Sequence, residues 1–100
     1  MCGVVIVSFG DSATSDIFHG IDSKAARAIP KAVWGIARRK LDMIDAAHEL
    51  KDLATPPGNR LEKLRGSLAG FYSIRVNDQF RAIFRFASGS AADVTITDYH

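Results

Sequence analysis

The chain has 100 residues, of which 47% are hydrophobic and 24% charged, a composition that is ordinary for a globular protein of one domain. A single cysteine, Cys2, excludes an internal disulfide framework, and no Cys or His cluster has metal-ligand spacing, so neither a metal site nor a cofactor is predicted. The apolar opening GVVIV is too short to cross a bilayer and follows no basic residue, so we predict no membrane segment or signal peptide and expect a cytoplasmic protein.

The net charge is only +2, but the charges are segregated along the chain. Residues 1–23 hold three Asp and no Lys or Arg, whereas residues 24–41 hold basic residues and no acid. Residues 60–85 hold a second basic group against only Glu62 and Asp78. This pattern favours a polyanionic partner, although a solvated helix face with scattered surface arginines would also produce it. The basic residues are Lys24, Arg27, Lys31, Arg38, Arg39 and Lys40 in the first group, and Arg60, Lys63, Arg65, Arg75, Arg81 and Arg85 in the second.

The first half of the chain predicts one strand followed by helices. VVIVSF (4–9) is typical of a buried strand, and DSATSDIFHG (11–20) of a short helix that Asp11 or Ser12 caps and Gly20 ends. A second helical stretch follows Ser23 and breaks before Pro30, which can open a third helix. The stripe expected to be buried on that helix consists of Val33, Ala37, Leu41 and Ile44, widened by Ile36 and Met43.

The second half predicts a sheet of sequential strands. TPPGN (55–59) ends the helical region, because two prolines and a glycine stop a helix. The period then changes to two, with strand candidates in RLEKLRG, GFYSIRV, QFRAIFRF and ADVTITDY. Helices followed by a strand meander predict an α+β fold, in which an antiparallel sheet has helices packed on one face.

The alternation of apolar residues predicts the register of the two central strands. A three-residue loop NDQ pairs Ile74 with Ala82 and Tyr72 with Phe84, which gives one cleanly apolar face. Arg75 and Arg81 then lie directly opposite each other on the polar face, where like charges are unfavourable. Guanidinium groups bind phosphate bidentately, so this pair predicts a phosphate site. Because Arg81 is expected on the polar face, its replacement is expected to leave the fold intact.

The last hairpin determines where the chain ends. We expect Phe84 and Phe86 to face Val94 and Ile96 in the core. If Phe86 pairs with Val94, Tyr99 lies beside Arg81, and the terminal Asp98, Tyr99 and His100 reach the edge of the arginine face. The alternative is that Tyr99 only covers the core and His100 is solvated.

Several long motifs resemble the HigB-type branch of the RelE/ParE toxin superfamily, also called plasmid-maintenance killer proteins. They are PPGNRLEKLRG, GFYSIRVNDQFRAIFRF and the terminal DYH, with the helix ARRKLDMIDAA in support. The resemblance runs from about Val5 to His100 in the family's order, so it implies a RelE-like fold and one toxin domain over residues 1–100.

The resemblance implies the toxin of a type II toxin–antitoxin pair, an endoribonuclease that enters the ribosomal decoding site and cuts mRNA without metal. It also implies a HigA-like helix-turn-helix antitoxin and a toxin–antitoxin complex that is a heterotetramer. The catalytic residues carried over by position are Arg65, Arg81, Asp98, Tyr99 and His100. Arg75 is a companion in phosphate binding, and Arg85, Arg60 and Lys63 are further candidates for RNA phosphates. The basic helix would contact ribosomal RNA through Lys31, Arg38, Arg39 and Lys40.

One position departs from the family pattern. Some relatives have a histidine where this chain has Glu62, so either Glu62 serves as the general base or the C-terminal residues hold that role. Two other functions are compatible with the arginines: a ParE-like toxin that inhibits gyrase, and a non-catalytic module that binds RNA or protein. Neither of them requires acid–base residues at the end of the chain.

Overall fold

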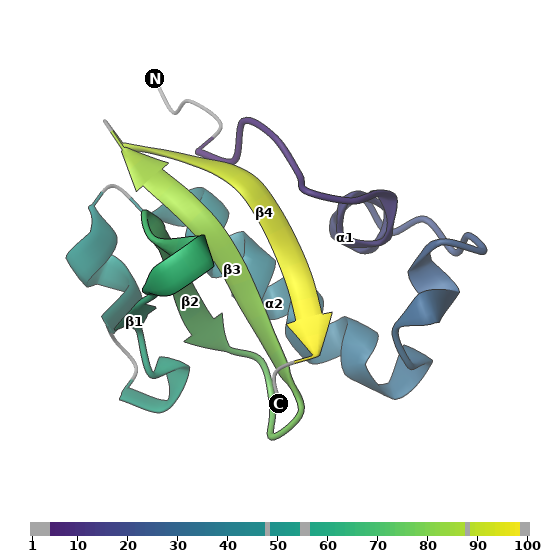
Figure 1. Cartoon of the computed structure of the whole chain (residues 1–100). Helices are drawn as coiled ribbons and strands as arrows, with labels where there is room; N and C mark the ends of the chain where they lie inside the picture. The colour runs from purple at the N-terminus through teal and green to yellow at the C-terminus, as the bar shows by residue number, and fades with distance from the viewer. Residues whose placement is uncertain (1–4, 48, 55–56, 88, 99–100) are drawn as a thin grey trace.

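The long helix of the first half lies across one face of a sheet formed by the second half, and the short helix before it lies beside the last strand (Figure 1). The computed structural model describes residues 5–47, 49–54, 57–87 and 89–98. The helices are α1 (Ser12–Phe18) and α2 (Lys31–Ala46), with short 3₁₀ segments η1 (Ala26–Ala28), η2 (Leu50–Ala54), η3 (Pro57–Asn59) and η4 (Gly66–Leu68). The strands are β1 (Glu62–Lys63), β2 (Phe71–Arg75), β3 (Phe80–Ala87) and β4 (Ser90–Asp98), in the spatial order β1-β2-β3-β4. All pairs are antiparallel, so the predicted α+β meander is confirmed.

The helix boundaries follow the local sequence signals. The Asp11 carboxylate accepts a hydrogen bond from the backbone N–H of Thr14 (2.9 Å) and caps α1, and Gly20 ends the turn after it with a φ of +74°. The stretch after Ser23 forms only the 3₁₀ segment η1, whose first N–H donates to the Ser23 hydroxyl. Pro30 is the N-cap residue of α2, as predicted.

The apolar stripe of α2 packs against the sheet, with one exception. Val33, Ala37, Leu41 and Ile44 are buried and face the sheet residues of the core, as expected. The prediction for Ile36 is wrong, because this side chain is 37% exposed. Ile36 is one residue, or about 100° around the helix, from Ala37, which turns it away from the sheet.

The N-terminal segment is not the buried strand that was predicted. Among the described residues, Ile6 and Phe9 form only isolated parallel bridges to Ala91 and Val94 of β4. Val7 is 62% exposed. The backbone N–H groups of Val5 and Ile6 donate to the Asp45 carboxylate of α2 (3.1 and 3.0 Å), which takes the place of part of a strand ladder. Val4 lies outside the described residues.

The central register is confirmed and the last one is wrong. Ile74 pairs with Ala82, and Arg75 with Arg81, as the apolar pattern required. In the last hairpin Phe86 pairs with Ala91 instead of Val94. The register shifts between Ile83 and Arg85, where β4 holds one extra residue near Asp93, which has a φ of +54°.

The first strand and the break before it are also shorter in the structure than in the sequence pattern. β1 consists of Glu62 and Lys63 only. Within TPPGN, residues 55–56 lie outside the described residues, and the rest forms η3.

No helix within the described ranges is both long and apolar enough to span a membrane.

Candidate functional site

The face of the sheet opposite α2 carries a hollow surrounded by cationic side chains. Its volume is about 240 Å³, and we call it the arginine hollow. Two of its residues, Arg75 and Arg81, are direct partners across the β2–β3 ladder, as predicted. The hollow is lined by Arg60, Arg75, Asn77, Asp78 and Arg81.

Arg81 forms the fixed part of the hollow. Its side chain is held on three sides: Nε donates to the Ser73 hydroxyl (3.0 Å), and Nη2 donates to the backbone carbonyl of Arg60 (2.8 Å) and pairs with Glu62 Oε1 (3.0 Å). Only 9% of the residue is exposed. Arg81 lies on the face opposite the apolar one, as predicted, but its burial and its partners argue against the expectation that its replacement leaves the fold intact. A guanidinium held in this way is a preorganised positive charge.

The other arginines of the hollow are held more loosely. Arg75 pairs with Asp78 of the β2–β3 loop, whose own side chain is almost fully exposed. The Asn77 side chain accepts hydrogen bonds from the backbone N–H groups of Gln79 and Phe80 (2.9 and 2.7 Å), and this shapes the loop. Arg60 has a φ of +47° and an exposed side chain. An anion that replaced Asp78 on Arg75 would therefore meet three guanidinium groups.

The end of β4 lies beside the same loop (Figure 1). Asp98 is the Cα partner of Phe80, and its carboxylate accepts a hydrogen bond from the Gln79 side chain (2.9 Å). Thr97 is the residue opposite Arg81, so the predicted pairing of Tyr99 with Arg81 is wrong. The reason is the tight last hairpin, in which Phe86 pairs with Ala91. Tyr99 and His100 themselves lie outside the described residues.

The remaining candidates for phosphate binding do not line the hollow. Lys63 pairs with Tyr72 and so belongs to the opposite face of the sheet from Glu62. Arg85 pairs with Asp93 (3.4 Å) and lies over the Phe71 ring (4.8 Å to its centroid), farther along β3. Arg65 is exposed at the start of η4.

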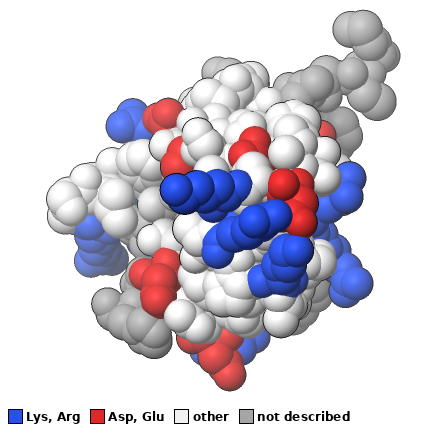
Figure 2. Space-filling view, turned by 90° about the vertical axis from the view of Figure 1, so that its right-hand side faces the viewer, with Lys and Arg blue, Asp and Glu red and all other residues white. Residues whose placement is uncertain are grey.

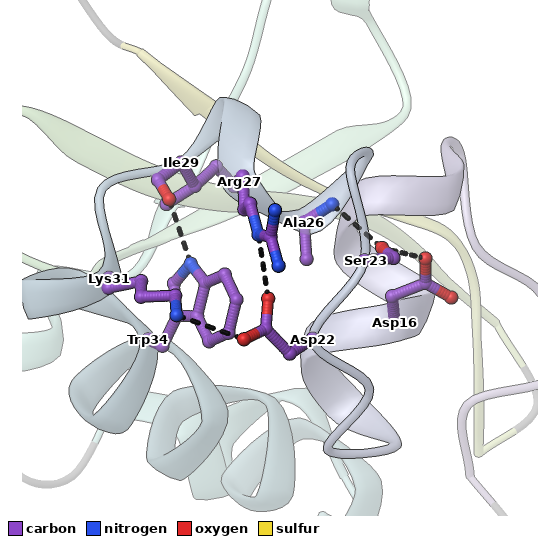
Figure 3. Close-up of polar contacts among 8 residues, drawn as sticks. All are labelled: Asp16, Asp22, Ser23, Ala26, Arg27, Ile29, Lys31 and Trp34. Atoms are coloured by element: carbon purple, nitrogen blue, oxygen red, sulfur yellow. Dashed lines mark hydrogen bonds and ion pairs between the residues drawn. The ribbon is translucent and has the colours of Figure 1, made fainter.

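The four basic residues expected to contact ribosomal RNA differ in their surroundings. Lys31 donates to Asp22 (2.9 Å) and lies over the Trp34 ring, and Arg27 pairs with the same carboxylate (Figure 3). Hydrogen bonds from Lys31 and then Arg27 lower the pKa of Asp22. Figure 2 shows the α1 side of the molecule, where Lys and Arg side chains lie among acidic ones.

The other three residues lie farther along α2. Arg38 lies beside Gly20, with Nη1 3.4 Å from where a β-carbon on that glycine would be. Arg39 is exposed. Lys40 is partly buried and donates to the side-chain oxygen of Asn59 (2.6 Å). Burial, followed by the charges of Arg39 and Arg75, lowers the pKa of Lys40.

Sequence reasoning missed three residues that support the hollow. Ser73 and Asn59 are fully buried polar residues, and Gln79 links the β2–β3 loop to the end of β4. The alternation of polar and core residues along β2 is a signal that could have identified Ser73. Asn59 lies in a loop with no periodic pattern, so the sequence carries no such signal for it. Within the described part of the chain, no three His, Cys, Asp or Glu residues are grouped as metal ligands would be.

Comparisons with known proteins identify the family. Residues 7–100 match the HigB-like toxin family, described as the RelE-like toxin of type II toxin–antitoxin system HigB. Toxin HigB-1 of Vibrio cholerae is 47% identical over 79 residues, which are 79% of this chain and 82% of that protein. An uncharacterised protein of Haemophilus influenzae is 45% identical over 58 residues, 58% of this chain and 57% of that one.

Solved structures confirm the fold. The YoeB–YefM complex from Staphylococcus aureus contains a chain similar to this one with a TM-score of 0.62, at 21% identity and 98% coverage of both chains. The YoeB dimer from the same organism gives a TM-score of 0.52, at 21% identity and 97% coverage of both. With the family match over almost the whole chain, the conclusion is that this chain belongs to the HigB-like toxins, the RelE-like toxins of type II toxin–antitoxin systems.

Proposed function

We propose that this toxin is a ribosome-dependent endoribonuclease that cleaves mRNA by attack of a 2′-hydroxyl on the adjacent phosphate. The observation that carries the proposal is the arginine hollow, where Arg60, Arg75 and Arg81 surround a space on the open face of the sheet. A single fold can serve several activities, so the activity is inferred from the chemistry of this site.

The proposed reaction needs charge stabilisation above all. The 2′-oxygen forms a bond to phosphorus, the bond from phosphorus to the 5′-oxygen breaks, and the products are a 2′,3′-cyclic phosphate and a 5′-hydroxyl. Phosphorus passes through a dianionic five-coordinate state, which fixed cations stabilise because they need not reorganise during the reaction. We assign this role to Arg81, held by Ser73 and the Arg60 carbonyl, and to Arg75 after the phosphate has displaced Asp78. Arg65 is an additional candidate from the family pattern.

Proton transfer completes the mechanism. One group must remove the 2′-hydroxyl proton, and one must protonate the leaving 5′-oxygen. We assign the acid–base role to His100, since imidazole titrates near neutral pH, with Tyr99 as a further candidate. Asp98 links the end of β4 to the loop of the hollow. Glu62 is bound to Arg81, so its first role is to orient that guanidinium. Because Glu62 is bound to a guanidinium of the hollow, its carboxylate is the second candidate for the general base if His100 does not accept the proton.

The ribosome is proposed as the source of substrate alignment. The net charge of +2 favours only weak binding to free RNA, and Lys31 and Lys40 already have partners within the protein. The exposed Arg38 and Arg39 remain as contacts to ribosomal RNA. A site with few convergent groups gains most of its rate from an oriented substrate. This target implies action in the cytoplasm.

We also propose an antitoxin partner of the HigA-like helix-turn-helix type, in a heterotetrameric complex. The support is the family match and the fact that the similar YoeB chain was solved with YefM.

The test compares naked and ribosome-bound mRNA. Purified toxin is mixed with an mRNA alone, with the same mRNA on programmed ribosomes, and with DNA gyrase and supercoiling substrate. The proposal predicts cleavage only on ribosomes and no effect on gyrase. Rapid cleavage of naked mRNA would contradict the ribosome dependence, and gyrase inhibition with intact mRNA would support the ParE-like alternative.

A further inference from the structure

Asn59 connects three elements behind the arginine hollow. This side chain is fully buried. Its amide nitrogen donates to the backbone carbonyl of Leu53 in η2 (3.2 Å) and contacts the Met43 sulfur of α2 (3.7 Å). Its oxygen accepts the hydrogen bond from Lys40 of α2 (2.6 Å). The end of η3 is thereby fixed to α2 and η2.

Arg60, the residue that follows Asn59, links this anchored segment to the arginine hollow. Arg60 has a φ of +47°, in the left-handed region that is unfavourable for a residue with a β-carbon. Such a conformation persists where the surrounding contacts hold it, and here its immediate neighbour is the anchored Asn59. In this conformation the Arg60 carbonyl accepts the hydrogen bond from Arg81 Nη2 (2.8 Å). A relaxed Arg60 would turn its carbonyl away from that guanidinium.

Lys40 completes the support from the helix side. Its ammonium is partly desolvated, and this burial lowers the pKa of Lys40. A partly buried charge needs a hydrogen-bond partner, which Asn59 supplies. The charge of Arg75 acts on the same ammonium, so Lys40 lies within electrostatic range of the hollow from behind the sheet.

We propose that Asn59 and Lys40 are positioning residues of the arginine hollow, which hold the guanidinium of Arg81 in place through the backbone of Arg60. The catalytic consequence rests on the proposed endoribonuclease function, whereas the positioning itself is measurable without activity. The competing explanation is that the two residues only join loops and α2 and leave Arg81 unaffected.

The first experiment observes Arg81 directly. Protein labelled with ¹⁵N gives an Nε–H resonance for Arg81, whose hydrogen bond to the buried Ser73 slows exchange with water. The variants are Lys40→Met and Asn59→Ala, and the control is Lys51→Met, which removes the same charge from an exposed side chain of η2. We expect the resonance to shift and its exchange to accelerate roughly tenfold or more in the first two, and to stay unchanged in the control. Lys40→Met keeps the apolar part of the side chain, so this variant alone tests the inference if Asn59→Ala does not fold.

The second experiment measures single-turnover cleavage on programmed ribosomes at matched concentrations of folded protein. The rate at saturating ribosomes should fall roughly 10- to 100-fold for the two variants, the scale on which a misplaced group affects rate. The half-saturating ribosome concentration should stay within about twofold, because Lys40 and Asn59 lie behind the site. A folded variant with the parental Arg81 resonance and rate overturns the inference. If the parent itself cleaves nothing, the proposed function fails, and the Arg81 resonance still decides the positioning.

Discussion

Arg81→Ala should lower the free energy of unfolding much more than Arg85→Ala does, although both residues lie on the same face of β3. Arg81 is 9% exposed and its guanidinium contacts Ser73, the Arg60 carbonyl and Glu62. Arg85 has an exposed side chain that pairs with Asp93 and lies over the Phe71 ring. The two substitutions remove the same atoms and the same charge. Their difference therefore measures what the buried position contributes.

The magnitude follows from the contacts. Loss of the two hydrogen bonds from a charged donor, which leaves a buried hydroxyl and a carbonyl without that partner, costs about 2–4 kcal/mol. The half-exposed Glu62 pair adds at most about 1 kcal/mol because solvent screens it, and relief of repulsion with Arg75 returns a few tenths. The melting temperature should fall by roughly 10–20 °C. Arg85→Ala should cost about 0.5–1 kcal/mol.

Urea unfolding followed by circular dichroism gives both free energies. Arg81→Lys, which keeps the charge but loses the planar fork, should fall between the parent and Arg81→Ala. Equal stability of Arg81→Ala and Arg85→Ala would refute the conclusion that Arg81 is a buried, preorganised cation.

Two further predictions concern Asp22 and the chain end. Because Lys31 and Arg27 lower the pKa of Asp22, its pairing stabilises the fold above the ordinary pKa of 3.8 and is lost as the pH falls through the lowered folded value. Asp22→Asn should therefore lower the melting temperature slightly at pH 7, and the difference from the parent should vanish in acid and shrink at high salt, while a persistent difference would contradict the pairing. Deletion of His100 should change stability by no more than about 0.5 kcal/mol but reduce cleavage of ribosome-bound mRNA roughly 100- to 10,000-fold, with a milder loss for Tyr99→Phe. Equal cleavage rates would assign proton transfer to Glu62.

The sequence was sufficient to predict the parts of the fold that a strict apolar alternation determines. The β2–β3 register and the opposed Arg75 and Arg81 follow from one buried face, since a slip by one residue would turn every side chain over. The β3–β4 register was missed because Ala87 pairs with Ser90, which makes the hairpin loop much shorter than a pairing of Phe86 with Val94 requires. The extra residue near Asp93, which has no signal in the apolar pattern, then moves the pairing by one residue, so that Thr97 instead of Tyr99 lies opposite Arg81.

The electrostatic environment of the site was harder to predict than its location. The basic residues of α2 formed one group in the sequence, yet Lys31 is paired with Asp22 and Lys40 is hydrogen-bonded to Asn59. Both partners lie outside α2 and meet these lysines only through tertiary structure. The burial of Arg81 depends in the same way on a backbone carbonyl, at Arg60, which no side-chain pattern reports.

The reaction proposed for the arginine hollow is cleavage of ribosome-bound mRNA through the 2′-hydroxyl next to the scissile phosphate. The most direct measurement uses ribosomes programmed with an mRNA that carries a single 2′-deoxy nucleotide at the cleavage position, beside an all-ribose mRNA of the same sequence. We predict that the ribose mRNA is cut and ends in a 2′,3′-cyclic phosphate, and that the 2′-deoxy mRNA stays intact at that position. Cleavage of both at the same rate would contradict the mechanism.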